Sequence, residues 1–167
     1  MPLVQARNLQ RPKYLFNGHL ETVFPTLFRK VILPPTAQDL VETHDGDVLE
    51  VDWHRKGNTK LVVISHGLEG NSSRSYVLGM AKEALKNGFD VLAWNYRGCG
   101  AALNRKAIFY HSGATDDLHT VVQHLPGDDS WPVLLVGFSL GGNLVLRYLG
   151  EQSSSVNGRI AAAAAIF

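Results

Sequence analysis

A strand-length apolar run that leads directly into a glycine-flanked serine constrains this sequence more than any other feature. Residues 133–138 read Val-Leu-Leu-Val-Gly-Phe, Ser139 follows, and residues 140–149 have helix-like spacing. Ser139 is therefore predicted on a sharp bend between a strand and a helix, with a strained backbone and an exposed hydroxyl. Side chains at Gly137 and Gly141 would collide with the neighbouring strand and helix. The pattern favours a nucleophilic serine over a chance glycine-rich connection.

Two backbone amides are candidates to stabilise negative charge beside this serine. Leu140 stands at the N-terminus of the predicted helix, where N–H groups are unpaired and the helix dipole is positive. A second apolar run, residues 61–64, ends in Ser65-His66-Gly67-Leu68, where a second oxyanion donor is needed, and the Leu68 amide fits that role. His66-Gly67 is alternatively a simple turn with a hydrogen-bonded histidine. Both interpretations can hold, because His66 can stabilise the loop while Leu68 donates.

Strand and helix patterns alternate after residue 38. An antiparallel hairpin with one buried face is predicted at 39–54, turning at Asp45-Gly46, and further strands are predicted at 61–64, 89–94, 133–138 and 159–167, the last of them buried. Helices follow Ser75 and Thr115, which are predicted as their N-caps, and Ser139. Residues 153–158 are predicted as a loop. The alternation predicts an α/β fold with a mostly parallel sheet and helices on both faces.

Residues 1–38 are expected to form an N-terminal extension or cap segment, and residues 39–167 the main domain. Apolar residues in this extension suggest a helix of one or two turns: Phe16, Leu20, Val23 and Leu27. Pro25 disfavours helical backbone at the residue before it, so the helix is expected to be short. This segment could cover a cleft or plug the edge of the core, and both interpretations remain open.

Composition excludes several classes of function. The chain has 167 residues, 45% hydrophobic, with a net charge of +1 and no long Lys or Arg run, so no nucleic-acid partner is expected. It has no apolar run of the ~20 residues that a membrane span needs. The single cysteine, Cys99, fits a reducing cytoplasm and cannot form an internal disulfide. His119 and His124 are five residues apart, the wrong spacing for one helical face, so no metal is expected.

Two further motifs have structural explanations. Residues 95–100, Asn-Tyr-Arg-Gly-Cys-Gly, lack phosphate-loop spacing and are interpreted as a structural turn near the site. His111 and Asp116 have the His-x-x-x-x-Asp spacing of a glycerolipid acyltransferase motif. Asp116 is better explained by its place in the first turn of a helix, where a carboxylate is favourable against the dipole.

Taken in order, the segments 65–70, 95–100 and 137–142 resemble the α/β-hydrolase superfamily, and 17–22 and 110–117 resemble its YheT-like branch of predicted hydrolases. The resemblance covers nearly the whole chain. It implies the α/β-hydrolase fold and hydrolysis of carboxylic esters, such as acyl esters or phospholipids, by a Ser-Asp-His triad without a cofactor. Ser139 would be the nucleophile, with the Leu68 and Leu140 amides as oxyanion donors.

The sequence departs from that pattern after the serine. In α/β-hydrolases the acid and then the histidine follow the nucleophile, yet none of the 28 residues after Ser139 is Asp or His, and Glu151 is the one acid. The chain is therefore expected to be the N-terminal part of such a domain, without its C-terminal strands and inactive or weakly active alone. His66 and His111 are candidate substitutes for the triad histidine, but nothing in their sequence spacing places either of them at Ser139. The alternatives are a non-catalytic scaffold or binding module and, third, an acyltransferase.

Overall fold

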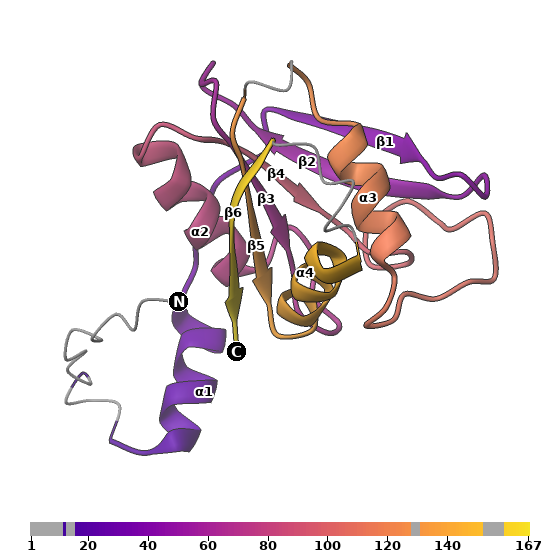
Figure 1. The fold of residues 1–167 in the computed structure, drawn as a ribbon. Helices are drawn as coiled ribbons and strands as arrows, with labels where there is room; N and C mark the ends of the chain where they lie inside the picture. Colours follow the sequence, from indigo (N-terminus) through magenta and orange to yellow (C-terminus); the bar gives the residue numbers. More distant parts are fainter. Residues whose placement is uncertain (1–11, 13–15, 128–130, 152–158) are drawn as a thin grey trace. The chain divides into compact units, whose positions relative to one another are not determined.

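The computed structural model describes residues 12, 16–127, 131–151 and 159–167. Two compact units, Met1–Val31 and Ile32–Phe167, make up the chain. The first unit contains helix α1 (Gly18–Phe28), whose N-cap is Asn17; the Leu20 amide donates to Asn17 Oδ1 at 2.9 Å. In its described residues, the second unit contains a six-stranded sheet and three helices (Figure 1). Whether the first unit acts as a cap stays a prediction.

Helix α1 is longer than the one or two turns predicted, and Pro25 lies inside it rather than ending it. Proline lacks the N–H that would bond four residues back, but its carbonyl can still accept. The Arg29 amide donates to the Pro25 carbonyl at 3.0 Å, which closes the last turn. The Asn17 cap also stabilises the first turn. The prediction used the apolar spacing alone, which does not include this cap.

The strands of the second unit lie in the order β1-β2-β4-β3-β5-β6. β1 pairs with β2 and β2 with β4 antiparallel, whereas β4, β3, β5 and β6 run parallel. The α/β class and the N-terminal hairpin that the sequence predicts are thus present. The strand bounds are β1 Ala37–Glu42, β2 Val48–His54, β3 Leu61–Ser65, β4 Asp90–Trp94, β5 Val133–Phe138 and β6 Ile160–Ile166.

Helices cover both faces of this sheet. α2 (Ser75–Lys86) packs on one face, and α3 (Thr115–Gln123) and α4 (Leu140–Glu151) pack on the other, as Figure 1 shows. The larger core includes Trp53, Trp94 and Leu135 beneath α3 and α4. Because β3, β4 and β5 are parallel neighbours, their carboxyl ends share one edge, where a ligand site is expected in this architecture. Among the described helices, none combines the length and apolarity needed to cross a bilayer.

The hairpin turn forms where Asp45-Gly46 predicts it, and Gly46 has φ +79°. One detail of the prediction is wrong: β2 is buried on both faces rather than on one. Two of its polar residues, Glu50 and Asp52, bond side chains of other elements. Asp52 accepts from Gln38 Nε2 at 2.6 Å and also bonds Ser72, while Glu50 bonds the side chain of Asn95. Polar residues in a strand therefore do not mark a solvated face when loops supply donors.

Three smaller predictions are also corrected. Ser75 and Thr115 are the first residues of α2 and α3, while Arg74 and Ala114 are the caps, and neither of these two residues caps its helix with a side-chain hydrogen bond. Thr115 instead donates through Oγ1 to Glu151 at 2.6 Å, which joins α3 to α4. β6 forms, but most of its side chains are exposed rather than buried, because it is an edge strand in the described part of the sheet. The predicted loop 153–158 lies outside the described residues.

Candidate active site

Ser139 lies on the bend between β5 and α4 with φ +50°, in the left-handed region. Such a conformation costs a non-glycine residue on the order of 1–3 kcal/mol, so the surrounding structure must impose it. The Ser139 amide donates to the Ile166 carbonyl at 2.7 Å, and the Ser139 carbonyl accepts from the Asn143 amide at 3.1 Å. Both main-chain groups of the serine are therefore fixed by neighbouring elements.

The glycines around Ser139 permit a close approach of strand and helix. A Cβ at Gly137 would lie well inside van der Waals distance of the Gly141 carbonyl, and a Cβ at Gly141 would meet the Ser65 carbonyl in the same way. These obstacles are backbone atoms, which cannot move aside as a flexible side chain could. The first turn of α4 therefore sits directly against the ends of β5 and β3.

The loop after β3 faces this bend. A Cβ built on Gly67 would lie 3.4 Å from the Phe138 carbonyl oxygen and 3.6 Å from Ser139 Cβ, so a side chain at this position would contact the serine. Leu68 is the next residue, and Leu140 directly follows the serine. Within the described residues, neither of these two amides donates a hydrogen bond. Whether these two amides form an oxyanion hole with Ser139 stays a prediction.

His66 holds this loop rather than facing Ser139. Its ring is fully buried; Nε2 accepts from the Tyr96 amide at 3.3 Å, so Nδ1 carries the proton and donates to the Gly67 carbonyl at 2.8 Å. Burial lowers the pKa of His66 to about 4. Because both ring nitrogens are engaged and the ring is neutral, His66 is a structural residue and not a general base for Ser139.

Three tyrosines support the same loop, and sequence reasoning missed all of them. The Gly67 amide donates to the Tyr76 hydroxyl at 3.0 Å, and the Glu69 amide donates to the Tyr110 hydroxyl at 3.1 Å. Tyr96 donates from its hydroxyl to the His66 carbonyl at 2.7 Å. Glu69 itself has φ +52°, a second strained position beside the serine. Isolated tyrosines carry no sequence pattern, so only the structure identifies these contacts.

A cavity of about 360 Å³ adjoins the loop on the side of β4. Its walls include Cys99 and Tyr110, and burial raises the pKa of the Cys99 thiol, which therefore stays protonated at neutral pH. A volume of this size is at the lower end of small-molecule sites. The other lining residues are Glu69, Gly70, Asn71, Arg97, Gly98 and Phe109.

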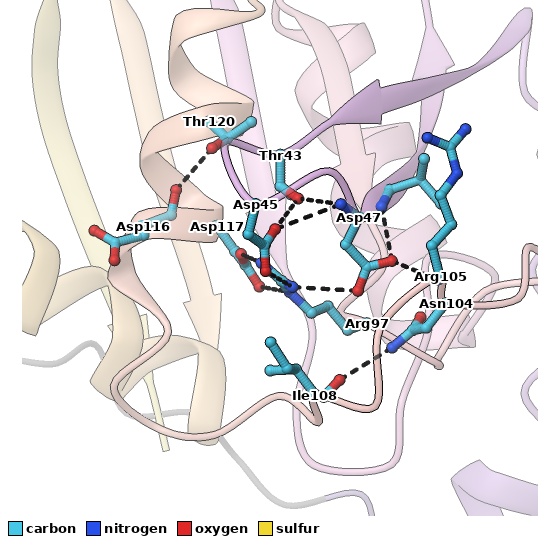
Figure 2. Close-up of polar contacts among 11 residues, drawn as sticks. Thr43, Asp45, Asp47, Arg97, Asn104, Arg105, Ile108, Asp116, Asp117 and Thr120 are labelled. Atoms are coloured by element: carbon cyan, nitrogen blue, oxygen red, sulfur yellow. Dashed lines mark hydrogen bonds and ion pairs between the residues drawn. The ribbon is translucent and has the colours of Figure 1, made fainter.

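Arg97, which lines this cavity, belongs to an ion cluster whose contacts Figure 2 shows. Arg97 is 5% exposed and makes a two-pronged contact with Asp117, through Nε at 2.9 Å and Nη2 at 2.7 Å. Its Nη1 also lies 2.7 Å from Asp45 and 3.2 Å from Asp47. The hydrogen bonds to Asp117 raise the pKa of Arg97, and the hydrogen bond from Arg97 lowers the pKa of Asp45, so these groups stay charged at neutral pH.

Residues 95–100 form the predicted turn, in which the Cys99 amide donates to the Tyr96 carbonyl at 2.9 Å. The role of Arg97 as the centre of a buried ion cluster was not predicted. Its partners come from the hairpin turn and from α3, 20 to 52 residues away in sequence. No local spacing could have identified them.

The other predicted residues lie as follows. Asp116 is in the first turn of α3, and its carboxylate points away from the ion cluster, while its carbonyl accepts from Thr120 (Figure 2). The His111 ring accepts from the Gly113 amide at 3.1 Å, and nothing pairs it with Asp116 or Ser139 in the described residues. His119 Nδ1 lies 3.0 Å from the Tyr148 hydroxyl. Across the described ranges, no group of three or more suitable side chains could hold a metal ion.

The sheet order and the helices on both faces define a fold of the α/β-hydrolase type, and comparison with known proteins agrees. The chain belongs to the α/β-hydrolase superfamily, and the model of the family described as serine aminopeptidase, S33, matches residues 56–167. A protein named "Putative esterase YheT" from Escherichia coli (strain K12) is 31% identical over 145 residues, covering 84% of this chain and 43% of that protein.

Two further relatives have different printed names. "Embryogenesis-associated protein EMB8" of Picea glauca is 32% identical over 155 residues, covering 85% of this chain and 34% of that protein. "Phospholipase ABHD3" of Homo sapiens is 32% identical over 143 residues, covering 77% of this chain and 35% of that protein. The chain thus spans well under half the length of each of these relatives.

Solved structures show the same fold. Mouse α/β-hydrolase domain-containing protein 10 has a TM-score of 0.63 at 18% identity, covering 78% of this chain and 49% of that one. The Pyrococcus furiosus esterase Pf2001 has a TM-score of 0.61 at 24% identity, covering 76% of this chain and 49% of that one. At these identities the likeness concerns the fold.

Proposed function

We propose that this chain carries the nucleophile and oxyanion hole of a serine hydrolase that acts on carboxylic esters. The observation that supports this most directly is the left-handed Ser139 backbone on the bend between β5 and α4, close to the loop that contains Gly67. Names of relatives such as "Phospholipase ABHD3" support esters with acyl or lipid character as substrates.

In the proposed reaction, Ser139 Oγ attacks the ester carbonyl carbon and loses its proton to a base. The Leu68 and Leu140 amides stabilise the oxyanion of the tetrahedral intermediate. The carbon–oxygen bond to the alcohol then breaks, the alcohol leaves with the proton, and an acyl-serine remains. Water attacks this ester by the same route, which releases the carboxylic acid and restores the serine hydroxyl.

The base and its partner acid of the proposed reaction are not among residues 140–167. In the α/β-hydrolase order both follow the nucleophile, and residues 140–167 contain neither Asp nor His. His66 cannot replace the base, because both of its ring nitrogens are occupied. Without a base the remaining oxyanion hole and binding contacts would retain only about 10³- to 10⁴-fold catalysis over water. The 167-residue chain is therefore expected to be weakly active at most.

A fluorophosphonate probe tests the nucleophile. We expect slow covalent labelling of the folded chain that disappears in Ser139→Ala, measured by intact-mass spectrometry. Ser73→Ala is the matched control, because Ser73 is exposed near the same loop and should leave labelling unchanged.

The absence of a base within residues 140–167 also supports a second candidate, a non-catalytic scaffold or binding module of the same fold. A folded sample that does not react with the probe at all, even over long incubation, would favour this candidate. Acyltransferase chemistry needs the same base, and no contact in the described residues favours it.

A further inference from the structure

Large apolar side chains are exposed beside the cavity, on residues 101–110, here called the rim loop. Leu103 is 89% exposed, Phe109 79% and Ile108 47%. The neighbouring Leu68, on the loop that faces Ser139, is 65% exposed. Phe109 lines the cavity, and Tyr110 accepts from the Glu69 amide, so the rim loop lies against the Ser139-facing loop. Clustered exposed apolar residues of this size commonly mark an interaction surface.

Hydrogen bonds hold the backbone of the rim loop in the conformation that exposes these apolar side chains. Glu50 accepts from the Ala101 and Ala102 amides at 3.0 Å each. The Arg105 amide donates to Asp47 at 2.7 Å, and Asn104 Nδ2 donates to the Ile108 carbonyl at 3.1 Å, both drawn in Figure 2. These bonds fix the loop at its start, tip and end. The apolar side chains are therefore kept in contact with water, which is energetically unfavourable.

The tip of the rim loop is basic. Arg105 and Lys106 are consecutive, and both are exposed. Arg105 lies 3.4 Å from Glu42 in a pair whose side chains are 57% and 68% exposed, which leaves it open to other anions. Lys106 has no ion pair within the described part of the chain. Apolar residues next to basic ones are the composition of segments that lie in a membrane interface, where anionic headgroups meet acyl chains.

We propose that the rim loop docks the protein on an anionic lipid surface, with Leu103 and Phe109 entering the interface and Lys106 and Arg105 contacting headgroup phosphates. The adjoining Leu68 would bring the cavity and Ser139 close to that surface. This inference goes beyond the proposed ester hydrolysis and does not require Ser139 to be reactive. The occupant is a lipid surface rather than a second protein because the exposed basic pair Arg105-Lys106 lies between exposed apolar residues in one short loop, which complements anionic headgroups above acyl chains.

Vesicle co-sedimentation tests the proposal. We expect the chain to bind vesicles of phosphatidylcholine mixed with phosphatidylglycerol more tightly than vesicles of phosphatidylcholine alone. Lys106→Glu should weaken binding to the mixed vesicles by about 5-fold or more, because each basic residue near an anionic surface contributes about that factor. The double variant Leu103→Ser with Phe109→Ser should weaken binding to both vesicle types by about tenfold or more.

Leu146→Ser is the matched control, since Leu146 is 54% exposed on α4 and lies outside the rim loop. It should bind like the unmodified chain, as should Ser139→Ala, which separates lipid docking from hydrolysis. Circular dichroism would show that each variant is folded. The proposal is overturned if no vesicle is bound, or if the rim-loop variants bind as well as Leu146→Ser. It is equally overturned if these variants abolish self-association in sedimentation velocity while the unmodified chain ignores vesicles, since the occupant would then be a second copy.

Discussion

Ser139 and His66 both depend on neighbours that hold them in states they would not adopt alone. The serine has a left-handed backbone, and the histidine stays neutral in a fully buried site. The two are linked, because His66 bonds the Gly67 carbonyl and Gly67 lies so close to the serine that a side chain there would contact it. Preorganised loops of this kind allow amides to meet developing charge without rearrangement.

The buried state of His66 predicts a loss of stability in mild acid. Its pKa is lowered from 6.5 to about 4 by burial, so the unfolded chain takes up a proton in this range that the native chain does not. The contribution of His66 is complete above pH 6.5 and falls as the pH is lowered toward 4, by on the order of 3 kcal/mol in total. Urea denaturation at several pH values measures this dependence.

His66→Asn should flatten the profile between pH 6.5 and 4, although it also lowers stability at neutral pH by removing the bonds to Tyr96 and Gly67. The control is His44→Asn, because His44 is exposed in the hairpin turn and should leave the profile close to that of the unmodified chain. Equal slopes in the unmodified chain and His66→Asn would contradict the assignment of the acid sensitivity to His66.

At the scale of elements, the Arg97 cluster joins three parts of the fold that are distant in sequence. Arg97 follows β4, Asp45 and Asp47 belong to the turn between β1 and β2, and Asp117 lies in α3. Asp47 also holds the Arg105 amide and therefore the rim loop. The cluster thus connects the sheet edge to the loop that borders the cavity.

Breaking this cluster should cost far more than breaking a surface pair. Asp117→Ala would leave the buried guanidinium without its two-pronged partner, and the free energy of unfolding should fall by about 3 kcal/mol or more. The comparison variant is Glu83→Ala, whose pair with Lys86 is 60% and 63% exposed and should cost under about 1 kcal/mol. Similar losses in the two variants, measured by urea denaturation, would show that the cluster is weakly coupled to stability.

Elements with a local signal were predictable. The strands, the Asp45-Gly46 turn and the bend at Ser139 all follow from periodicity and turn chemistry over a few residues. The length of α1 was missed because a helix can continue past Pro25 when that residue still accepts a bond. The burial of both faces of β2 was missed because the partners of Asp52, Gln38 in β1 and Ser72 in the loop before α2, lie 14 and 20 residues away in sequence.

At the scale of the whole molecule, both hydrophobic cores are formed by residues of the second unit. We therefore expect a chain that starts at Ile32 to unfold cooperatively, with a free energy of unfolding within about 1 kcal/mol of that of the 167-residue chain. Thermal and urea denaturation of the two chains measure the difference. A shortened chain that fails to fold would show that residues 1–31 contribute to the stability of the second unit.

The candidate site as a whole was only partly accessible from sequence. The sequence identifies Ser139, Leu140 and Leu68 as candidate site residues because they follow predicted strands. Their catalytic roles stay predictions. The supporting tyrosines and the cavity wall come together only through the sheet order, which places loops from β3 and β4 next to each other. Sheet order depends on long-range pairing, for which a single sequence carries little information.

Trp94 is placed so that its fluorescence can report on the loop that faces Ser139. Its indole Nε1 donates to Ser65 Oγ at 2.9 Å, and its ring meets that of Tyr96 edge-on at 4.7 Å between centroids. The indole is thus an intrinsic fluorophore attached to the base of the loop that faces Ser139. Replacing Trp53 and Trp131 by phenylalanine would leave Trp94 as a single emitter, and its emission could then follow ligand arrival in real time without an attached dye.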